Sequence, residues 1–286
     1  MQQLPAPPEH RARKRFGQNF LHDPGTIRRI VAAVAPTPGQ HLVEIGPGRG
    51  ALTAGLLEAA GELDVIELDR DLAGPLAERL GPLGHLRVHQ ADALRFDLCA
   101  LLPTAAAAAG ARLRLVGNLP YNISTPLLFR FLDQADCIHD LHLMLQKEVV
   151  DRLAAAPGQK IYGRLSVMVQ SRCAVRRVLS VGPGAFTPAP KVDSAVVHLV
   201  PLRPPPIPIA DPALHARIVA AAFSQRRKRI TNSLRGLADA ALLEGLGLDP
   251  GARAEALSVA DFARVANAAA AHANGAAPGC IPSPNP

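Results

Sequence analysis

The sequence predicts an α/β protein whose doubly wound, mostly parallel sheet of seven strands is followed by a small all-α domain. Three features of the 286 residues support this prediction. Short apolar runs alternate with segments of helical composition as far as Val200. A proline-dense segment, 201–208, then interrupts the chain. Beyond it the composition changes to Ala and Leu, without further strand signals.

The first predicted strand, 41–45, runs directly into a glycine turn that starts at Gly46, and a helix-forming segment, 51–60, follows. Such a strand, turn and helix begin a nucleotide-binding α/β unit, because glycine lets the backbone approach a ligand closely. The glycines have the spacing G-x-G-x-G, however, and Pro47 removes one backbone donor. The sequence contains no G-x-x-x-x-G-K-[ST] loop. The turn is therefore not expected to cradle a diphosphate.

Acidic residues follow the next two predicted strands. The strand 64–66 ends at Glu67, roughly twenty residues after the glycine turn, where a carboxylate can accept hydrogen bonds from both ribose hydroxyls. Asp69 is the alternative, although an Asp in this place more often caps the following helix. The strand 86–89 is followed by Asp92, which can accept from the amino group of a bound adenine. We expect these groups at one edge of the sheet.

Four more apolar runs complete the predicted sheet: 113–116, 141–145, 175–181 and 195–200. The last two have no helix between them, so we expect them to pair antiparallel. The segment 201–208 contains too much proline for a helix or a central strand, and it therefore marks a domain boundary. We expect domains over 1–202 and 203–272, followed by a disordered tail over 273–286.

The most informative motif, Asn118-Leu119-Pro120-Tyr121, follows the strand 113–116. It offers an Asn side-chain carbonyl, a main-chain carbonyl at Leu119 in a segment stiffened by proline, and the face of Tyr121. Together these groups suit a planar base with an exocyclic amine, such as adenine. Asn-X-Pro-Tyr also serves enzymes that methylate DNA adenine or a glutamine amide, and a plain strand-end turn uses the same residue types.

A site with ribose and adenine contacts but no phosphate cradle suits an adenosine that carries a sulfonium amino acid, namely S-adenosylmethionine. Combined with a clamp for a target amine, it predicts a methyltransferase. No metal is expected, because His85 and His89 have no third ligand beside them. The cysteines lie far apart and form no C-x-x-C pair, so neither a zinc site nor a disulfide framework is expected. They are Cys99, Cys137, Cys173 and Cys280.

The charge of the chain favours a polyanionic partner. The formal net charge is +7 and the pI is near 9.7, although net charge does not distinguish RNA from DNA or a membrane. No acidic residue lies between Asp211 and Asp239, where six basic residues occur: Arg217, Arg226, Arg227, Lys228, Arg229 and Arg235. We expect the run 226–229 to spread round a helix that tracks phosphates, with an apolar stripe formed by Ile230, Leu234 and Leu237. A second basic cluster, 11–15 with Arg28 and Arg29, is expected to guide RNA across the site.

These motifs together resemble the ribosomal RNA adenine dimethyltransferases, over Lys14 to Ala266. The segment Gln18-Asn19-Phe20-Leu21 matches the family's amino-terminal motif, in which the Asn and the Leu contact the methyl donor. The segment 43–53 matches its glycine motif, and 118–124 matches its catalytic motif. Two later segments also match, a loop over 186–194 whose Phe packs on the target base and a basic helix over 223–228.

The resemblance implies a Rossmann-like methyltransferase sheet, S-adenosylmethionine as methyl donor and three groups of site residues. Catalytic roles are expected for Asn118, Leu119, Tyr121 and Phe186. Cofactor contacts are expected from Asn19, Leu21, Gly46, Glu67, Asp92 and Asn118. RNA contacts are expected from Lys191, Arg226, Arg227, Lys228 and Arg229.

Within this family the motifs are most similar to those of the branch that dimethylates two adjacent adenines near the 3′ end of 16S rRNA and is linked to kasugamycin sensitivity. This resemblance implies a monomer that acts on 16S rRNA in an immature small ribosomal subunit. A large-subunit methyltransferase of the macrolide-resistance type is an alternative, and a mainly non-catalytic assembly checkpoint factor is another. The basic amino terminus is not followed by an apolar core, so we expect no signal peptide, no membrane contact and a cytoplasmic protein.

Overall fold

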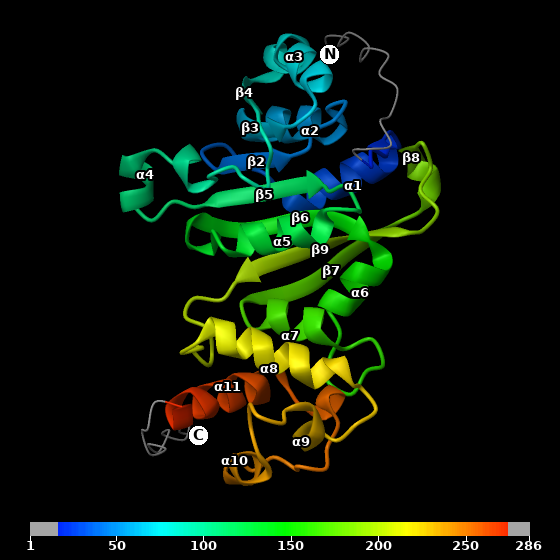
Figure 1. The fold of residues 1–286 in the computed structure, drawn as a ribbon. Helices are drawn as coiled ribbons and strands as arrows, with labels where there is room; N and C mark the ends of the chain where they lie inside the picture. The colour runs from blue at the N-terminus through cyan, green and yellow to red at the C-terminus, as the bar shows by residue number, and fades with distance from the viewer. Residues whose placement is uncertain (1–16, 274–286) are drawn as a thin grey trace. The chain divides into compact units, whose positions relative to one another are not determined.

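The computed structural model describes residues 17–273. Its central feature is a seven-stranded sheet with the strand order β4-β3-β2-β5-β6-β9-β7 (Figure 1). The strands are β2 (His41–Ile45), β3 (Glu62–Glu67), β4 (His85–Gln90), β5 (Leu113–Asn118), β6 (Ile138–Gln146), β7 (Cys173–Val181) and β9 (Ser194–Pro201). The pairs β2–β3, β2–β5, β3–β4 and β5–β6 are parallel, whereas β9 runs antiparallel to β6. The predicted fold class is therefore confirmed.

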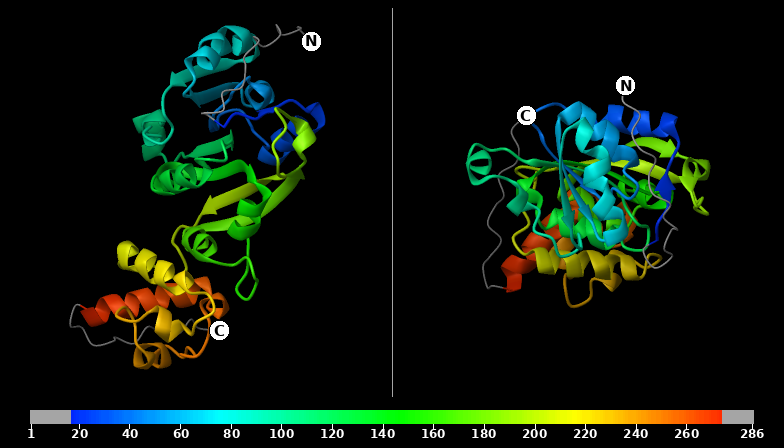
Figure 2. Two further views of the ribbon diagram at one scale, coloured as in Figure 1. Left: turned by 45° about the vertical axis from the view of Figure 1, so that its right-hand side comes forward. Right: turned by 90° about the horizontal axis from the view of Figure 1, so that it is seen from above.

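Helices lie on both sides of this sheet (Figure 2). They are α1 (Pro24–Val34), α2 (Ala51–Ala60), α3 (Arg70–Leu80), α4 (Thr104–Ala108), α5 (Ser124–Leu132) and α6 (Lys147–Leu153). Ile30 of α1, Leu56 of α2 and Leu76 of α3 are almost completely buried, in one core cluster with Val65 and Val116 of the sheet. Burial of this apolar surface, rather than local propensity, holds these three helices against the strands.

A second, two-stranded sheet joins distant parts of the chain. Strand β1 (Phe20–Leu21) pairs antiparallel with β8 (Phe186–Thr187), so that Leu21 lies opposite Phe186. The amino-terminal motif and the later loop of the sequence are thus neighbours in the fold. No local pattern in either segment indicates this pairing.

The chain divides into two compact units. Of the described residues, the first unit contains 17–150 together with Val175–Pro201, and the second contains Asp151–Ala174 and 202–273. Residues 151–174 were expected in the first domain, and this assignment is wrong. Tyr162 and Val167 belong to the same buried cluster as Ile218 and Phe262, so burial of their side chains places the segment in the second unit.

The second unit consists of α7 (Arg164–Gln170), α8 (Pro212–Ser224), α9 (Ile230–Ser233), α10 (Ala240–Gly245) and α11 (Val259–Ala273). Ile230 and Leu234 are buried as the apolar stripe requires, but the basic run does not lie on a helix. Helix α8 ends at Ser224, and Gln225 adopts φ −132° and ψ 67°, which helical backbone excludes. The basic residues therefore form an exposed turn between α8 and α9.

The cysteine prediction is also corrected. Cys99 and Cys137 form a disulfide with a Cα–Cα distance of 5.5 Å, although 38 positions separate them. Their spacing in the sequence does not reveal this pairing, because both lie in short turns that tertiary contacts bring together. Cys173 is buried and free. Cys280, the basic stretch 11–15 and the tail after Ala273 lie outside the described residues.

None of the helices in the described part of the chain is long and apolar enough to cross a membrane.

Candidate active site

A cavity in the first unit lies where the parallel strands β2, β3, β4 and β5 end. This is the edge at which open α/β sheets bind their ligands. Five stretches of the chain line it: 17–21, 44–52, 66–72, 91–94 and 118–127, each in part. The predicted residues Asn19, Leu21, Gly46, Glu67, Asp92, Asn118, Leu119 and Tyr121 are all among the lining residues.

The glycine turn forms one wall of the cavity. Gly46, Gly48 and Gly50 have φ angles of 67°, 56° and 76°, in the left-handed region that glycine adopts without strain. A Cβ on Gly48 would lie 3.2 Å from the ring of Phe20, whereas a Cβ on Gly46 would meet no protein atom within 4 Å. The left-handed φ and this close contact both favour glycine at 48, and the open space at Gly46 leaves room for a ligand.

Two backbone N–H groups hold the Glu67 carboxylate in the wall of the cavity. Glu67 is buried at the end of β3, where Oε1 accepts from the Asp69 N–H at 2.8 Å and Oε2 accepts from the Gly48 N–H at 3.1 Å. Burial raises the pKa of Glu67 against the lowering effect of these backbone hydrogen bonds. Each oxygen retains a second lone pair for a hydroxyl. Asp69 instead accepts from the Asp71 N–H at the start of α3, which is the capping role.

Asp92 follows β4 and lines the same cavity. Its Oδ1 accepts from the Leu94 N–H at 2.9 Å, which fixes the carboxylate in a tight turn. The side chain remains 38% exposed, so it is accessible to an adenine amine.

Asn118 is the last residue of β5, and a distant main-chain group orients its amide. Its Nδ2 donates to the carbonyl of Asn19 at 3.0 Å. With the nitrogen held in this way, Oδ1 is the atom of the amide that remains as an acceptor toward the cavity. The neighbouring Leu119 N–H donates to the Met144 carbonyl at 3.2 Å, which ties the motif to β6.

The amino-terminal motif packs over the catalytic motif. Gly17 has φ 59°, and a Cβ there would lie 2.7 Å from Oδ1 of Asn122. Leu21 is buried in β1 and lines the cavity, as does Asn19, whose Nδ2 donates to the Gly17 carbonyl at 3.4 Å. The resemblance alone pointed to Asn19 and Leu21, and the structure brings both to the cavity.

Phe186 is buried, whereas Lys191 is exposed, as an RNA contact requires. The Phe186 ring is only 3% exposed, lies in the buried cluster with Leu21 and does not line the cavity. In this structure Phe186 therefore packs in the core beside the strand pair β1–β8, and its stacking on the target base stays a prediction. Lys191 is exposed on the following loop and also lies outside the cavity lining.

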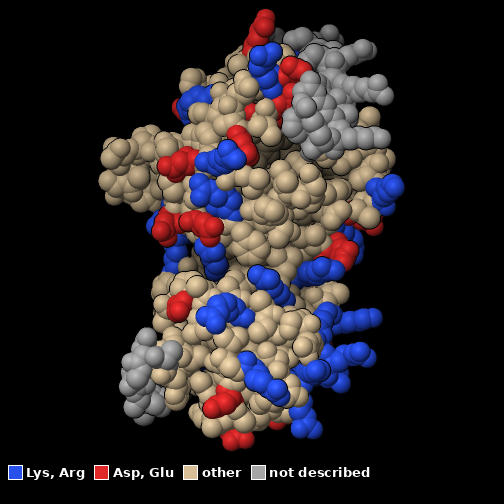
Figure 3. Space-filling model, in the orientation of Figure 1, with Lys and Arg blue, Asp and Glu red and all other residues tan. Residues whose placement is uncertain are grey.

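The basic turn of the second unit is exposed at each of its four positions, 226–229. Figure 3 shows Lys and Arg side chains gathered on one side of this unit. Arg226, however, has contacts within the unit: it donates to the carbonyls of Lys160 and Tyr162, both at 2.8 Å, and lies 3.5 Å from Glu255. Arg226 thus fixes the turn, and the next three residues present the charge.

One residue of the cavity was missed from the sequence. Glu44 on β2 is 2% exposed, lines the cavity, and its Oε2 has no hydrogen-bond partner among the described residues. Burial raises the pKa of Glu44 to about 8, although the nearby Thr53 hydroxyl acts in the opposite direction. The sequence pattern that could have identified Glu44 is a carboxyl within an apolar strand that leads directly into a glycine turn. Such a group can accept from a cationic amino group.

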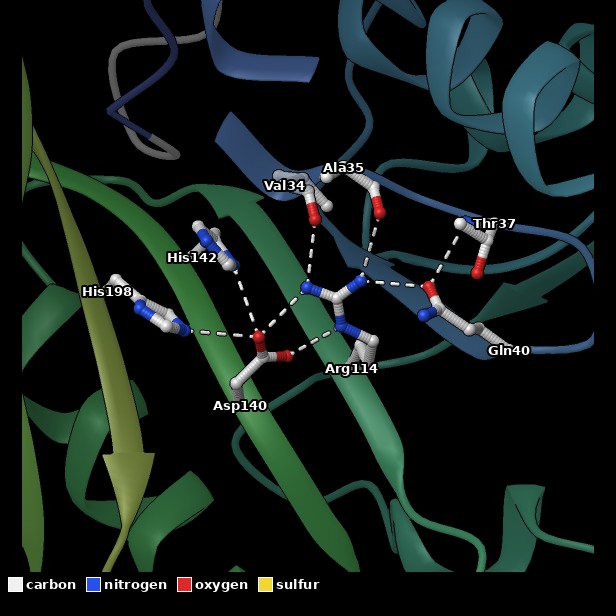
Figure 4. A network of polar contacts seen from close by, with 8 residues as sticks. All are labelled: Val34, Ala35, Thr37, Gln40, Arg114, Asp140, His142 and His198. Carbon is white, nitrogen blue, oxygen red and sulfur yellow. Dashed lines mark hydrogen bonds and ion pairs between the residues drawn. The ribbon is translucent and has the colours of Figure 1, made fainter. Parts of the chain in front are cut away.

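Three side chains on the neighbouring strands β6 and β9 approach the spacing of a metal site. The ligand atoms of Asp140, His142 and His198 lie within 4.8 Å of one another (Figure 4). Arg114, however, donates to both oxygens of Asp140 at 2.9 Å and to the carbonyl of Val34 at 2.8 Å. A cation between the ligands would be repelled by the guanidinium. We therefore interpret the cluster as a buried ion-pair network.

Solved structures resemble this fold over most of the chain. A dimethyladenosine transferase from Plasmodium falciparum is 25% identical with a TM-score of 0.74, and the match covers 90% of this chain and 98% of that one. The 23S rRNA methyltransferase ErmE is 26% identical with a TM-score of 0.69, covering 88% and 100% respectively. Fold and site together define a methyltransferase.

The family follows from sequence similarity. The model for "Ribosomal RNA adenine dimethylase" matches residues 9–271. "Ribosomal RNA small subunit methyltransferase A" of Pseudomonas aeruginosa is 54% identical over 259 residues, which are 91% of this chain and 95% of the relative. The chain belongs to the ribosomal RNA adenine dimethylase family.

Proposed function

We propose that the protein transfers methyl groups from S-adenosylmethionine to the exocyclic amines of two adjacent adenines in a loop near the 3′ end of 16S rRNA. The observation that supports this most directly is the orientation of Asn118, whose amide oxygen remains available beside the cavity. The family's name specifies adenine and dimethylation, and the relative's name specifies the small subunit. The substrate is 16S rRNA within an immature small subunit, and the enzyme acts as a monomer.

The cavity residues fit the adenosine of the donor. Glu67 accepts from the ribose hydroxyls, Asp92 accepts from the adenine amine, and Gly46 leaves open space for close approach. Glu44 offers an unpartnered oxygen to the ammonium group of the amino acid. When bound, the donor supplies a methyl group on a positively charged sulfur.

Asn118 and Leu119 activate the target amine. The Asn118 amide oxygen and the Leu119 carbonyl accept hydrogen bonds from the two N–H groups of the amine. These bonds draw the nitrogen out of conjugation with the purine, so that its lone pair is free for in-line attack on the methyl carbon. Tyr121 holds the base by stacking and favours the positive charge that passes between sulfur and nitrogen. The alkylated amine is acidic enough to lose its proton to water, so the motif contains no general base. Because the monomethylated amine has one hydrogen, the second transfer uses one acceptor.

The target adenine must leave its stack to reach this cavity, and unstacking costs least in a loop or single strand. The exposed basic residues Arg227, Lys228 and Arg229 contact phosphates of the RNA, and Lys191 supplies a further cation.

The test is transfer of radiolabelled methyl to small ribosomal subunits that lack the modification, with large-subunit RNA measured in parallel. We expect about four methyl groups per small subunit, two on each flipped adenine. Asn118→Ala should abolish most turnover while leaving RNA binding nearly unchanged. Label on large-subunit RNA alone would indicate the resistance-type activity, which the similarity to ErmE makes the second candidate. Tight binding to small subunits without label would indicate a checkpoint factor.

A further inference from the structure

The Tyr121 phenol has a buried partner that no part of the proposed mechanism uses. The hydroxyl of Ser194 lies 2.5 Å from the Tyr121 oxygen, although 73 positions separate the two residues. Ser194 is 0% exposed, whereas Tyr121 lines the cavity. We propose that Ser194 is a positioning residue for methyl transfer, which holds the Tyr121 ring in the orientation that receives the target base. This proposal rests on the proposed function.

The Ser194 hydroxyl is rigidly placed. Ser194 is the first residue of β9 and pairs with Gln146 of β6. The carbonyl of the preceding residue, Asp193, accepts from the Lys147 N–H at 2.9 Å. Because backbone pairing fixes both sides of the residue, the hydroxyl has only its short side-chain torsion left to lose on binding a partner.

Tyr121, in contrast, lies outside the regular elements of the fold. It belongs to the turn after Pro120, and its main-chain carbonyl accepts from the Ser124 hydroxyl at 3.1 Å. That bond fixes the backbone but not the ring, which can still rotate about its two side-chain torsions. The Ser194 contact fixes the far end of the ring. A ring held at both ends presents the same face to the cavity before and after the base binds. The ring therefore loses little conformational freedom when the base is positioned.

The same contact links the ring to an exposed loop. The loop 188–193 follows β8, in which Phe186 pairs with the cavity residue Leu21, and it ends at Ser194. Both ends are therefore attached to walls of the cavity, and Lys191 lies between them. RNA that binds this loop therefore contacts the segment that ends at Ser194, the hydrogen-bond partner of Tyr121.

A double-mutant cycle tests the proposal. Ser194→Ala and Tyr121→Phe each remove one hydroxyl of the same hydrogen bond, and each should lower kcat about fivefold, the effect of a typical hydrogen bond. The double variant should be no slower than either single variant. The KM for S-adenosylmethionine should not change, because the ribose and adenine contacts remain. Losses in kcat that multiply in the double variant would overturn the proposal. Tyr121→Phe keeps the ring, so the cycle has one informative arm even if Ser194→Ala folds poorly.

A spectroscopic measurement separates this proposal from the function on which it rests. The chain contains two tyrosines and no tryptophan, so 13C-labelled tyrosine gives two ring environments, Tyr121 and Tyr162. Tyr121→Phe assigns the signals, and Ser194→Ala should shift the Tyr121 signal and leave the Tyr162 signal in place. An unshifted Tyr121 signal would overturn the positioning role whatever the activity. A shifted signal without methyl transfer by the unmodified protein would instead overturn the proposed function.

Discussion

Glu44 is expected to decrease the stability of the protein, and Glu44→Gln should increase it. The carboxyl has an ordinary pKa of 4.5, whereas burial raises its pKa to about 8 in the folded protein. The folded-state pKa lies above the unfolded value. Below pH 4.5 Glu44 is protonated in both states and costs no stability, whereas the free energy of unfolding falls as the pH rises toward 8. From this pKa difference the loss is about 1 kcal/mol at pH 5, about 3 kcal/mol at pH 7 and about 5 kcal/mol above pH 9.

Glutamine has the same shape and cannot ionise, so the variant should lack this pH dependence. The assay is urea unfolding of both proteins at pH 5, 7 and 8.5. We expect the variant's advantage in free energy of unfolding to grow from about 1 to about 5 kcal/mol over this range, as the linkage relation requires. The same variant should bind S-adenosylmethionine more weakly, because an amide does not offer a carboxylate to an ammonium group.

Parallel stability curves for the two proteins between pH 5 and 8.5 would refute this reasoning, since they would mean that Glu44 ionises in the folded state with an ordinary pKa. Higher stability together with weaker cofactor binding would identify Glu44 as a group retained for function at a cost in stability.

Three further results are expected. Glu67→Ala should raise the S-adenosylmethionine concentration required by about 10- to 100-fold, the value of one or two hydrogen bonds to a charged group. Asp69→Ala should instead cost about 1 kcal/mol of stability, because the helix α3 loses its cap. If Glu67→Ala and the unmodified protein bind S-adenosylmethionine equally well, the ribose role belongs to Asp69. Cys99→Ser should lower the free energy of unfolding by up to about 4 kcal/mol for a separation of 38 residues, and a reductant should abolish the difference from the unmodified protein. Alanine at 227–229 should weaken RNA binding and flatten its salt dependence, whereas Arg226→Ala should mainly lower stability.

The main sheet was predictable because its strands are short apolar runs bounded by turns. The predicted run 41–45 is β2 itself, and the runs 64–66 and 86–89 lie inside β3 and β4. Parallel strands place their carboxyl ends at one edge, so the convergence of Glu67 and Asp92 followed from the strand assignments alone.

What the sequence did not reveal depends on long-range contacts. The pairing of β1 with β8 joins segments that have no complementary pattern, and it is this pairing that buries Phe186. Just after the end of α8 at Ser224, the Arg226 guanidinium likewise reaches carbonyls in the segment 151–174. Composition identified that basic run as a charged surface but could not determine its backbone conformation.

Two buried carboxylates of the same sheet show why burial alone does not indicate function. Burial acts to raise the pKa of both, yet Arg114 and neighbouring histidines hold the pKa of Asp140 below its ordinary value, whereas Glu44 has no such counterion and its pKa rises. Asp140 is neutralised within the protein, so its role is structural. Glu44 lies in the wall of the cavity, its Oε2 has no hydrogen-bond partner among the described residues, and we expect a cationic group of the ligand to stabilise its charge. Cofactor binding should therefore lower the pKa of Glu44 and release a proton near neutral pH, which calorimetry in buffers of different ionisation enthalpy would detect and which Glu44→Gln would abolish.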